Sequence, residues 1–108
     1  MKFKRFSSMY QCKEHYVYIM TNKNRTVLYI GVTSELGERV HKHFCGLWNG
    51  FAKKYNCHYL IYYEKFEYIS DAIKREKQLK GWRREKKLTL ITTKNPQLKF
   101  LNDEIQSL

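Results

Sequence analysis

The strongest constraint on the fold is a pair of short apolar runs that are separated by a polar connector. Residues 16–20 (YVYIM) and residues 27–32 (VLYIGV) are rich in β-branched and aromatic side chains, which is typical of β-strands. The residues between them, 21–26 (TNKNRT), have the composition of a turn. This order predicts an antiparallel β-hairpin near the start of the chain.

Side-chain alternation predicts which residues of the hairpin share a face. If all the connector residues form the loop, Tyr18 lies directly opposite Tyr29, and the two phenols share one face. The other face carries the aliphatic side chains of Val17, Ile19, Leu28 and Ile30. A slip of one residue would mix the two faces, so the sorting supports this register. From the hairpin alone, ordinary cross-strand packing of the tyrosines is the simpler interpretation.

Periodicity predicts one more strand and three helices in the rest of the chain. A first helix begins after Thr33 or Ser34, either of which can cap it, and its buried stripe is Leu36, Val40, Phe44 and Leu47. Arg39 and His43 are four residues apart and therefore share a face of this helix. The remaining elements are a strand at residues 59–66, a helix at 70–80 that Gly81 ends, and a helix at about 82–91.

Charge limits the class of partner. The chain has 108 residues, enough for one domain, and its 21 Lys and Arg against 10 Asp and Glu leave a net charge of +11. Such a charge favours nucleic acid first and an anionic membrane second. No apolar run exceeds about five residues, against the roughly 18 needed to span a bilayer, and the first residues lack a secretory signal. We expect a soluble, cytoplasmic protein.

Cysteine and histidine spacing gives little support for a disulfide or a zinc site. The three cysteines are an odd number with no C-x-x-C spacing, which favours reduced thiols. Because His41 and His43 are two apart in a helix, they point to different sides of it. This disfavours a structural zinc site built from His41, His43, Cys45, Cys57 and His58.

The segment from Lys74 to Lys87 combines one inward acid with a strong positive charge. Glu76 is three or four residues from Ala72, Ile73 and Leu79, in the middle of the apolar stripe. A carboxylate there is costly unless it binds a metal or a cation; an internal ion pair with an arginine, or an edge position open to solvent, would also explain it. The segment holds eight basic and two acidic residues, which favours phosphate-backbone binding over a plain solvated face. We assign this binding to Lys74, Lys77, Lys80, Arg83, Arg84, Lys86 and Lys87.

Five elements in order resemble the GIY-YIG nuclease domain: YVY at residues 16–18, YIG at 29–31, Arg39, His43 and a helical Glu76. The match is closest to small stand-alone members that resemble the N-terminal nuclease domain of the bacterial excision-repair C subunit. Further similarity lies in residues 72–82 (AIKREKQLKGW), the Lys86-Lys87 pair and Asn95-Pro96. The resemblance implies an α+β fold, a small three-stranded antiparallel sheet flanked by helices, in agreement with the three predicted strands. We expect a basic N-terminal arm at 1–15, the nuclease-like domain at 16–101 and a C-terminal tail at 102–108.

The resemblance also implies an activity, a DNA endonuclease that hydrolyses phosphodiester bonds with one Mg²⁺ or Mn²⁺ ion. Arg39 would donate to the phosphate oxygens, Tyr29 would take a proton from the attacking water, and Tyr18 would position that water or share the task. His43 would orient a tyrosine or the phosphate. Glu76 would be the one carboxylate ligand of a metal that keeps several waters.

Two departures from the family pattern limit this transfer. Tyr16 stands where the first motif has a glycine, and Val32 stands where the excision-repair relatives have a lysine. The asparagine that follows the metal glutamate in some relatives has no clear match. We expect single-strand nicking in DNA repair or in the processing of structured DNA, by a monomer, with no membrane or small-molecule substrate. RNA stays open as a substrate, and the alternative function is a non-catalytic, basic nucleic-acid-binding module.

Overall fold

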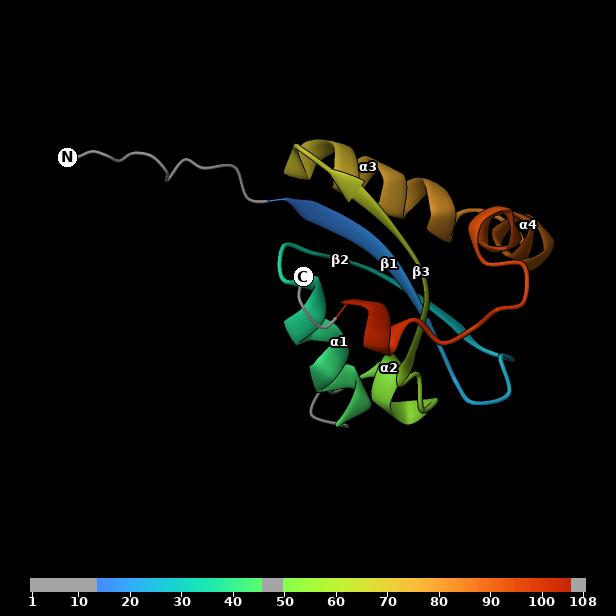
Figure 1. Cartoon of the computed structure of the whole chain (residues 1–108). Helices are drawn as coiled ribbons and strands as arrows, with labels where there is room; N and C mark the ends of the chain where they lie inside the picture. The colour runs from blue at the N-terminus through green and yellow to red at the C-terminus, as the bar shows by residue number, and fades with distance from the viewer. Residues whose placement is uncertain (1–13, 46–49, 106–108) are drawn as a thin grey trace.

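A three-stranded antiparallel sheet occupies the centre of the computed structural model, which describes residues 14–45 and 50–105 (Figure 1). The middle strand is β1 (His15–Thr21), with β2 (Leu28–Thr33) on one side and β3 (Tyr59–Phe66) on the other. The bounds of β3 agree with the sequence prediction. The predicted α+β fold class, with three antiparallel strands and flanking helices, is confirmed.

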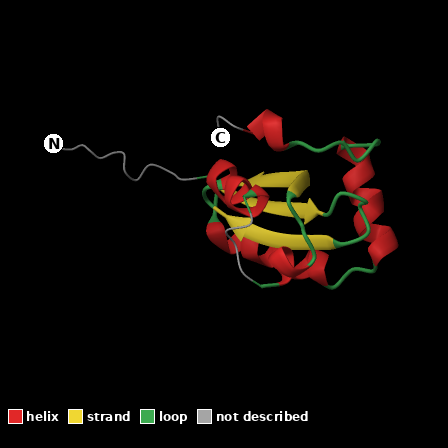
Figure 2. Ribbon diagram, turned by 90° about the horizontal axis from the view of Figure 1, so that it is seen from below, coloured by secondary structure: helices red, strands yellow, loops and turns green. Residues whose placement is uncertain are grey.

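Helices cover both faces of this sheet (Figures 1 and 2). On one face lies α3 (Ile69–Lys80), followed by α4 (Arg84–Lys94); on the other lie α1 (Leu36–Phe44), the short α2 (Phe51–Lys54) and the 3₁₀ helix η2 (Asn102–Ile105). In the described part of the chain no helix is long and apolar enough to cross a membrane.

The two faces of the sheet bury different kinds of side chain. The core between the sheet and the helices α3 and α4 is mainly aliphatic. Its buried residues include Val17, Ile19, Ile30 and Ile61 of the sheet and Ala72, Leu79 and Ile91 of the helices. The core on the α1 side of the sheet is more aromatic, and its buried residues include Tyr16, Tyr18, Met20 and Leu60 of the sheet and Leu36, Val40 and Ile105 of the helices. The predicted sorting of the hairpin is therefore confirmed, since Val17 and Ile19 lie on the opposite face from Tyr18.

The predicted pairing of the hairpin is wrong by two residues. Tyr18 pairs with Gly31, and Tyr29 pairs with Met20 instead of lying opposite Tyr18. A shift of two residues keeps every side chain on its face. The apolar pattern could therefore select the faces without selecting the partners.

The turn explains the shift. Thr21 continues β1 instead of joining the loop, pairs with Leu28, and donates from Oγ1 to the carbonyl of Val27 over 2.7 Å. The side chain of Asn22 accepts hydrogen bonds from the backbone N–H groups of Thr26 and Val27. The side chain of Asn22 thus stabilises the loop, as asparagine often does in turns. The loop begins at Asn22, one residue later than predicted.

Gly31 makes room for the ring of Tyr18. A Cβ atom at Gly31 would lie 2.5 Å from Oη and 2.6 Å from Cζ of Tyr18, well inside van der Waals contact. The glycine of the second motif is thus required by the tyrosine of the first, because the two residues are cross-strand partners.

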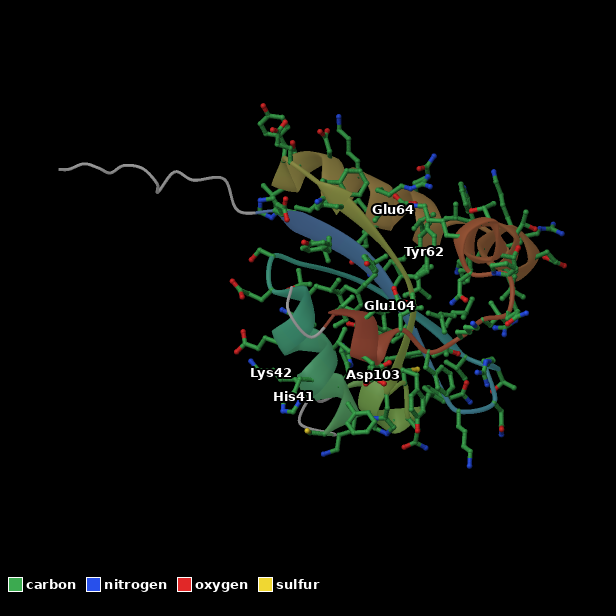
Figure 3. All side chains as sticks on the ribbon, in the orientation of Figure 1. His41, Lys42, Tyr62, Glu64, Asp103 and Glu104 are labelled. Carbon is green, nitrogen blue, oxygen red and sulfur yellow. The ribbon has the colours of Figure 1, made fainter. Side chains whose placement is uncertain are left out.

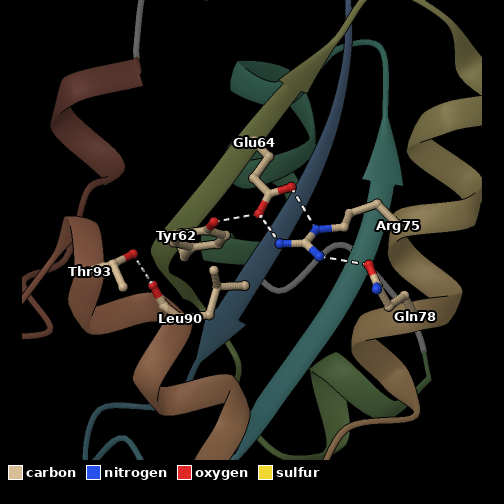
Figure 4. Close-up of polar contacts among 6 residues, drawn as sticks. All are labelled: Tyr62, Glu64, Arg75, Gln78, Leu90 and Thr93. Atoms are coloured by element: carbon tan, nitrogen blue, oxygen red, sulfur yellow. Dashed lines mark hydrogen bonds and ion pairs between the residues drawn. The ribbon is translucent and has the colours of Figure 1, made fainter.

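An internal ion pair joins β3 to α3 (Figure 4). The guanidinium of Arg75 donates from Nε and Nη2 to the two carboxylate oxygens of Glu64, each over 2.9 Å, and the hydroxyl of Tyr62 donates to the same carboxylate. Burial alone would raise the pKa of Glu64, but these hydrogen bonds lower it below its usual value. Arg75 therefore anchors α3 to the sheet.

Several predicted helix details need correction. Phe44 is 56% exposed and does not belong to the buried stripe of α1, which holds Leu36 and Val40; Leu47 lies outside the described residues. Thr33 accepts a hydrogen bond from the backbone N–H of Glu35, but the N-cap residue of α1 is Glu35 itself.

The last predicted helix is displaced toward the C-terminus, to Arg84–Lys94. Trp82 donates its backbone N–H to the carbonyl of Leu79, and Arg83 is extended, so the chain turns before it re-enters a helix. Residues 102–105, which we predict from the sequence to begin a tail, form η2 with Ile105 buried. Residues 1–13 of the predicted arm lie outside the described residues.

We predict that Gly31→Ala lowers the free energy of unfolding by about 2 kcal/mol, because the new methyl group overpacks the ring of Tyr18. Gly81→Ala is a matched control, since a Cβ there meets its nearest atom at 3.5 Å. Urea denaturation of the two variants and the parent chain checks this. Equal stability of Gly31→Ala and Gly81→Ala would contradict the proposed packing.

Candidate active site

Four of the five predicted site residues meet between the sheet and α1. Tyr18 comes from the middle of β1, Tyr29 from β2, and Arg39 and His43 from consecutive turns of α1. The ring centroids of Tyr18 and His43 are 5.9 Å apart, and those of Tyr29 and His43 are 5.4 Å apart. Because residues four apart share a helix face, α1 presents both Arg39 and His43 to Tyr18.

Tyr18 lies at the centre of a short chain of hydrogen bonds. Arg39 donates from Nη1 to the phenol oxygen over 3.4 Å, and the same oxygen lies 3.3 Å from Nε2 of His43. A guanidinium can only donate, so the phenol accepts from Arg39 and keeps its own proton for the imidazole. The direction that fits all three groups runs from Arg39 through Tyr18 to His43.

Burial keeps the phenol of Tyr18 and the imidazole of His43 uncharged. Tyr18 is fully buried and His43 is 2% exposed. Burial raises the pKa of Tyr18 to about 12, and the hydrogen bond from Arg39 offsets only part of the shift. Burial, together with the positive charge of Arg39, lowers the pKa of His43 to about 4. At neutral pH the pair is therefore a phenol and an uncharged imidazole.

A second histidine supports His43 from outside the predicted set. Nδ1 of His58 lies 2.6 Å from the backbone carbonyl of His43 and acts as the donor. From the sequence, His58 is a candidate only as a zinc ligand. Its contact with the backbone of His43 could not be predicted, because the two residues are 15 apart and do not share an element.

Tyr29 occupies a more open position than Tyr18. Its ring lies 6.3 Å from that of Tyr18 and stacks at 6.3 Å on Phe51, which is 51% exposed. The exposed fraction of Phe51 shows that this aromatic row leads outward from the buried tyrosine. Phe51 begins α2 and is not among the predicted site residues; its only signal in the sequence is an aromatic residue directly after Gly50.

A surface hollow of about 280 Å³ adjoins Tyr29 at the free edge of the sheet. Its walls come from β2, α2, α3 and α4, and its lining residues are Leu28, Tyr29, Ile30, Phe51, Lys80 and Lys87. Two of the seven predicted nucleic-acid-binding residues, Lys80 and Lys87, thus lie beside Tyr29. The hollow combines a phenol, an exposed aromatic ring and two cations, which suits a phosphate group of a nucleic acid.

Glu76 lies in the other layer of the fold, apart from the other four predicted site residues. It lies on α3, whose buried residues are Ala72 and Leu79, and Oε2 of Glu76 is 3.0 Å from Nζ of Lys80. Its side chain is 20% exposed, so it lies at the edge of the apolar stripe instead of its middle. The structure therefore joins Glu76 to the hollow through Lys80, and not by a direct contact with Tyr18.

The remaining basic residues spread over α3, α4 and the turn between them. Lys74, Lys77, Arg83, Arg84 and Lys86 are exposed. Arg84 donates to the backbone carbonyl of Arg25 over 2.8 Å, and the ammonium of Lys86 lies 4.3 Å from the ring centroid of Trp82. Together with Lys80 and Lys87, these exposed lysines and arginines make up the basic surface, which is the set of seven residues assigned above. Two of these seven residues, Lys80 and Lys87, also line the hollow.

The residues considered for zinc do not gather at one point. His41 lies on the outer side of α1 (Figure 3), whereas His43 faces Tyr18 and Cys57 is buried. Within residues 14–45 and 50–105, no group of three or more His, Cys, Asp or Glu side chains is arranged to hold a metal. Glu76 offers a single, partly exposed carboxylate. That donor fits a hard divalent cation such as Mg²⁺ or Mn²⁺, which retains most of its waters.

Comparison with known proteins supports the same region of the chain. A family model described as the GIY-YIG catalytic domain matches residues 14–89. A UPF0213 protein of Staphylococcus saprophyticus is 37% identical over 79 residues, which are 73% of this chain and 95% of that protein. A UPF0213 protein of Staphylococcus aureus is 38% identical over 77 residues, which are 71% of this chain and 93% of that protein.

A solved structure agrees with the fold. The solution NMR structure of a UPF0213 protein from Bacillus halodurans has a TM-score of 0.52 to this chain at 27% identity, and the match covers 78% of this chain and 88% of that one. The family-model match spans every residue of the site, from Tyr18 to Lys87.

We predict that His43 makes the protein less stable in mild acid. The unfolded chain takes up a proton near pH 6.5, but folded His43 does so only near pH 4, so stability is lost as the pH falls through this window. The loss between pH 7 and 4.5 is about 2 kcal/mol, since one pKa unit corresponds to about 1.4 kcal/mol. Urea denaturation at several pH values measures it.

The control for this prediction is His41→Gln, on the exposed side of the same helix. His43→Gln should show a shallower fall of stability with pH than the parent chain, whereas His41→Gln should follow the parent. Parallel curves for His43→Gln and the parent chain would show that His43 is not buried uncharged.

Proposed function

The chain belongs to the GIY-YIG family of catalytic domains, and on this premise we propose that it is a divalent-metal-dependent endonuclease that nicks DNA. GIY-YIG domains are nuclease domains, so a nuclease-type function with DNA as the substrate follows from the family. The finer proposal rests on one observation. Tyr29 packs against His43, which contacts Tyr18 as Arg39 does, and Tyr29 alone of these four residues lines a hollow that also holds two lysines.

The two tyrosines support different roles in hydrolysis. Tyr18 stays protonated at neutral pH, because burial raises its pKa to about 12, so no phenolate is available there to act as a base. Its hydroxyl lies within hydrogen-bond distance of Arg39 and His43. We assign it to positioning Arg39. Tyr29 adjoins the hollow, so we assign to its phenolate form, which has already given up its own proton, the removal of a proton from the attacking water.

Arg39 and the lysines would stabilise the charge of the reacting phosphate. A guanidinium presents a planar donor fork to phosphate oxygens, and Lys80 and Lys87 add positive charge at the hollow. Glu76 would hold Mg²⁺ or Mn²⁺ together with waters. When bound, such an ion neutralises phosphate charge and lowers the pKa of a bound water.

The basic surface of α3 and α4 would hold the DNA backbone on either side of the hollow. Contacts of lysine and arginine with phosphates give affinity that depends on salt and little on sequence. This fits a nuclease that acts in repair or on structured DNA as a monomer.

Two observations favour the alternative, a non-catalytic nucleic-acid-binding module. The acid of Glu76 is paired with Lys80, and the buried Tyr18 and His43 satisfy each other as core residues can. A binding module would retain the basic surface and show no cleavage.

We predict that Tyr29→Phe slows nicking of supercoiled plasmid by about a hundredfold, because general base catalysis contributes 10² or more, and that it leaves stability unchanged. Tyr18→Phe should instead destabilise the protein by about 1–2 kcal/mol, since it removes the hydrogen bonds that the buried phenol makes with Arg39 and His43. Nicking rates and urea denaturation of both variants test the division of roles. Equal loss of stability in the two variants would contradict it.

We predict that Glu76→Gln removes metal-dependent nicking and leaves DNA binding in place, because the amide keeps the shape but not the charge that holds a divalent cation. Glu85→Gln, at an exposed acid of α4, is the control and should cleave like the parent chain. Plasmid nicking with Mg²⁺ or Mn²⁺, and with a chelator, measures the effect.

Cleavage by Glu76→Gln that persists with the chelator would reject this assignment of the metal ligand. DNA binding by the parent chain without cleavage of any plasmid, single-stranded or branched substrate would favour the binding module.

A further inference from the structure

Lys80 belongs to two parts of the site at once. Its ammonium lies 3.0 Å from Oε2 of Glu76, and its side chain also lines the hollow beside Tyr29. Glu76 is 20% exposed and Lys80 is 55% exposed. The carboxylate is thus held at the protein surface by a cation whose stem is free to move.

The strand next to the hollow supplies no cation of its own. β2 has the sequence LYIGVT, and Val32 packs against the aliphatic core under α3. The positive charges at the hollow come instead from two helices, as Lys80 of α3 and Lys87 of α4. Of these two, Lys80 is also the partner of the proposed metal ligand.

A divalent cation and the ammonium of Lys80 compete for the same carboxylate. A cation bound to Glu76 would repel an ammonium that is held at ion-pair distance. The existing pair is easy to separate, because an exposed pair four residues apart in a helix contributes little to stability. A phosphate bound in the adjacent hollow could receive the displaced ammonium, because Lys80 lines that hollow.

We propose that Lys80 is a positioning residue that exchanges partners: it neutralises Glu76 in the metal-free protein and binds a non-bridging phosphate oxygen of the nucleic-acid backbone once a divalent cation occupies Glu76. By linkage, phosphate in the hollow then raises the affinity of Glu76 for the cation, and the cation raises the affinity for phosphate by the same factor. The phosphate half rests on the proposed function. The competition at Glu76 does not.

The first test measures Mn²⁺ binding to the DNA-free protein by the electron paramagnetic resonance signal of free Mn²⁺. Lys80→Gln should lower the dissociation constant at least about twofold, the factor that an ion pair four residues apart in a helix supplies. Lys77→Gln, an exposed lysine on the same helix, should change it less than about twofold, and Lys80→Arg should restore the parent value.

The Glu76→Gln background makes this test specific. There the Lys80→Gln substitution should have no effect on Mn²⁺ binding, because the acid for which the two cations compete is gone. An unchanged dissociation constant in Lys80→Gln would overturn the proposal, and so would an equal gain with and without Glu76. These affinities are measured without DNA, so they decide the competition even if the chain cleaves nothing.

The second test measures binding of a short labelled DNA duplex in the Tyr29→Phe background, where turnover is slow. Lys80→Gln should weaken binding several-fold with Mn²⁺ present and leave it nearly unchanged with a chelator. Lys77→Gln should weaken binding by the same factor in both conditions. A loss in Lys80→Gln that does not depend on Mn²⁺ would show a plain backbone contact and would overturn the exchange of partners.

Discussion

The close approach of the Tyr18 phenol to Gly31 is the contact on which the rest of the site depends. Any side chain at residue 31 would occupy the space of the phenol. A buried phenol also needs hydrogen-bond partners, and Arg39 and His43 of α1 supply them. One contact across the hairpin therefore makes room for the phenol at the place where two polar side chains of α1 reach it.

Two ion pairs on α3 have opposite consequences for mobility. The pair of Arg75 with Glu64 is partly buried and joined by two hydrogen bonds, so it fixes the helix to β3. The pair of Lys80 with Glu76 involves one contact between more exposed groups. Pairs of the first kind hold a fold together, whereas pairs of the second kind exchange partners at small cost. The helix thus combines a rigid inner side with an adaptable outer side.

The environments of the two motif tyrosines suggest a division of labour that neither motif reveals. Tyr18 is enclosed and holds its proton, while Tyr29 adjoins an open hollow with an aromatic neighbour and two lysines. Similar residues acquire different chemical tasks when burial and neighbouring charges differ. The family assignment and this asymmetry together support the proposed hydrolysis at the edge of β2.

Much of the fold follows from local pattern. The alternation of apolar side chains predicts the two faces of the hairpin correctly. The predicted bounds of β3 agree with the structure. The charge density of residues 74–87 indicates where the basic surface lies. The pairing of Tyr18 with Gly31 did not follow, because a shift of two residues leaves the apolar pattern intact. Nor did the partner of Glu76 or the place of Phe51, since both depend on which helices meet at the edge of the sheet. Local sequence determines which side of an element is buried, whereas contacts between elements decide which charges become neighbours.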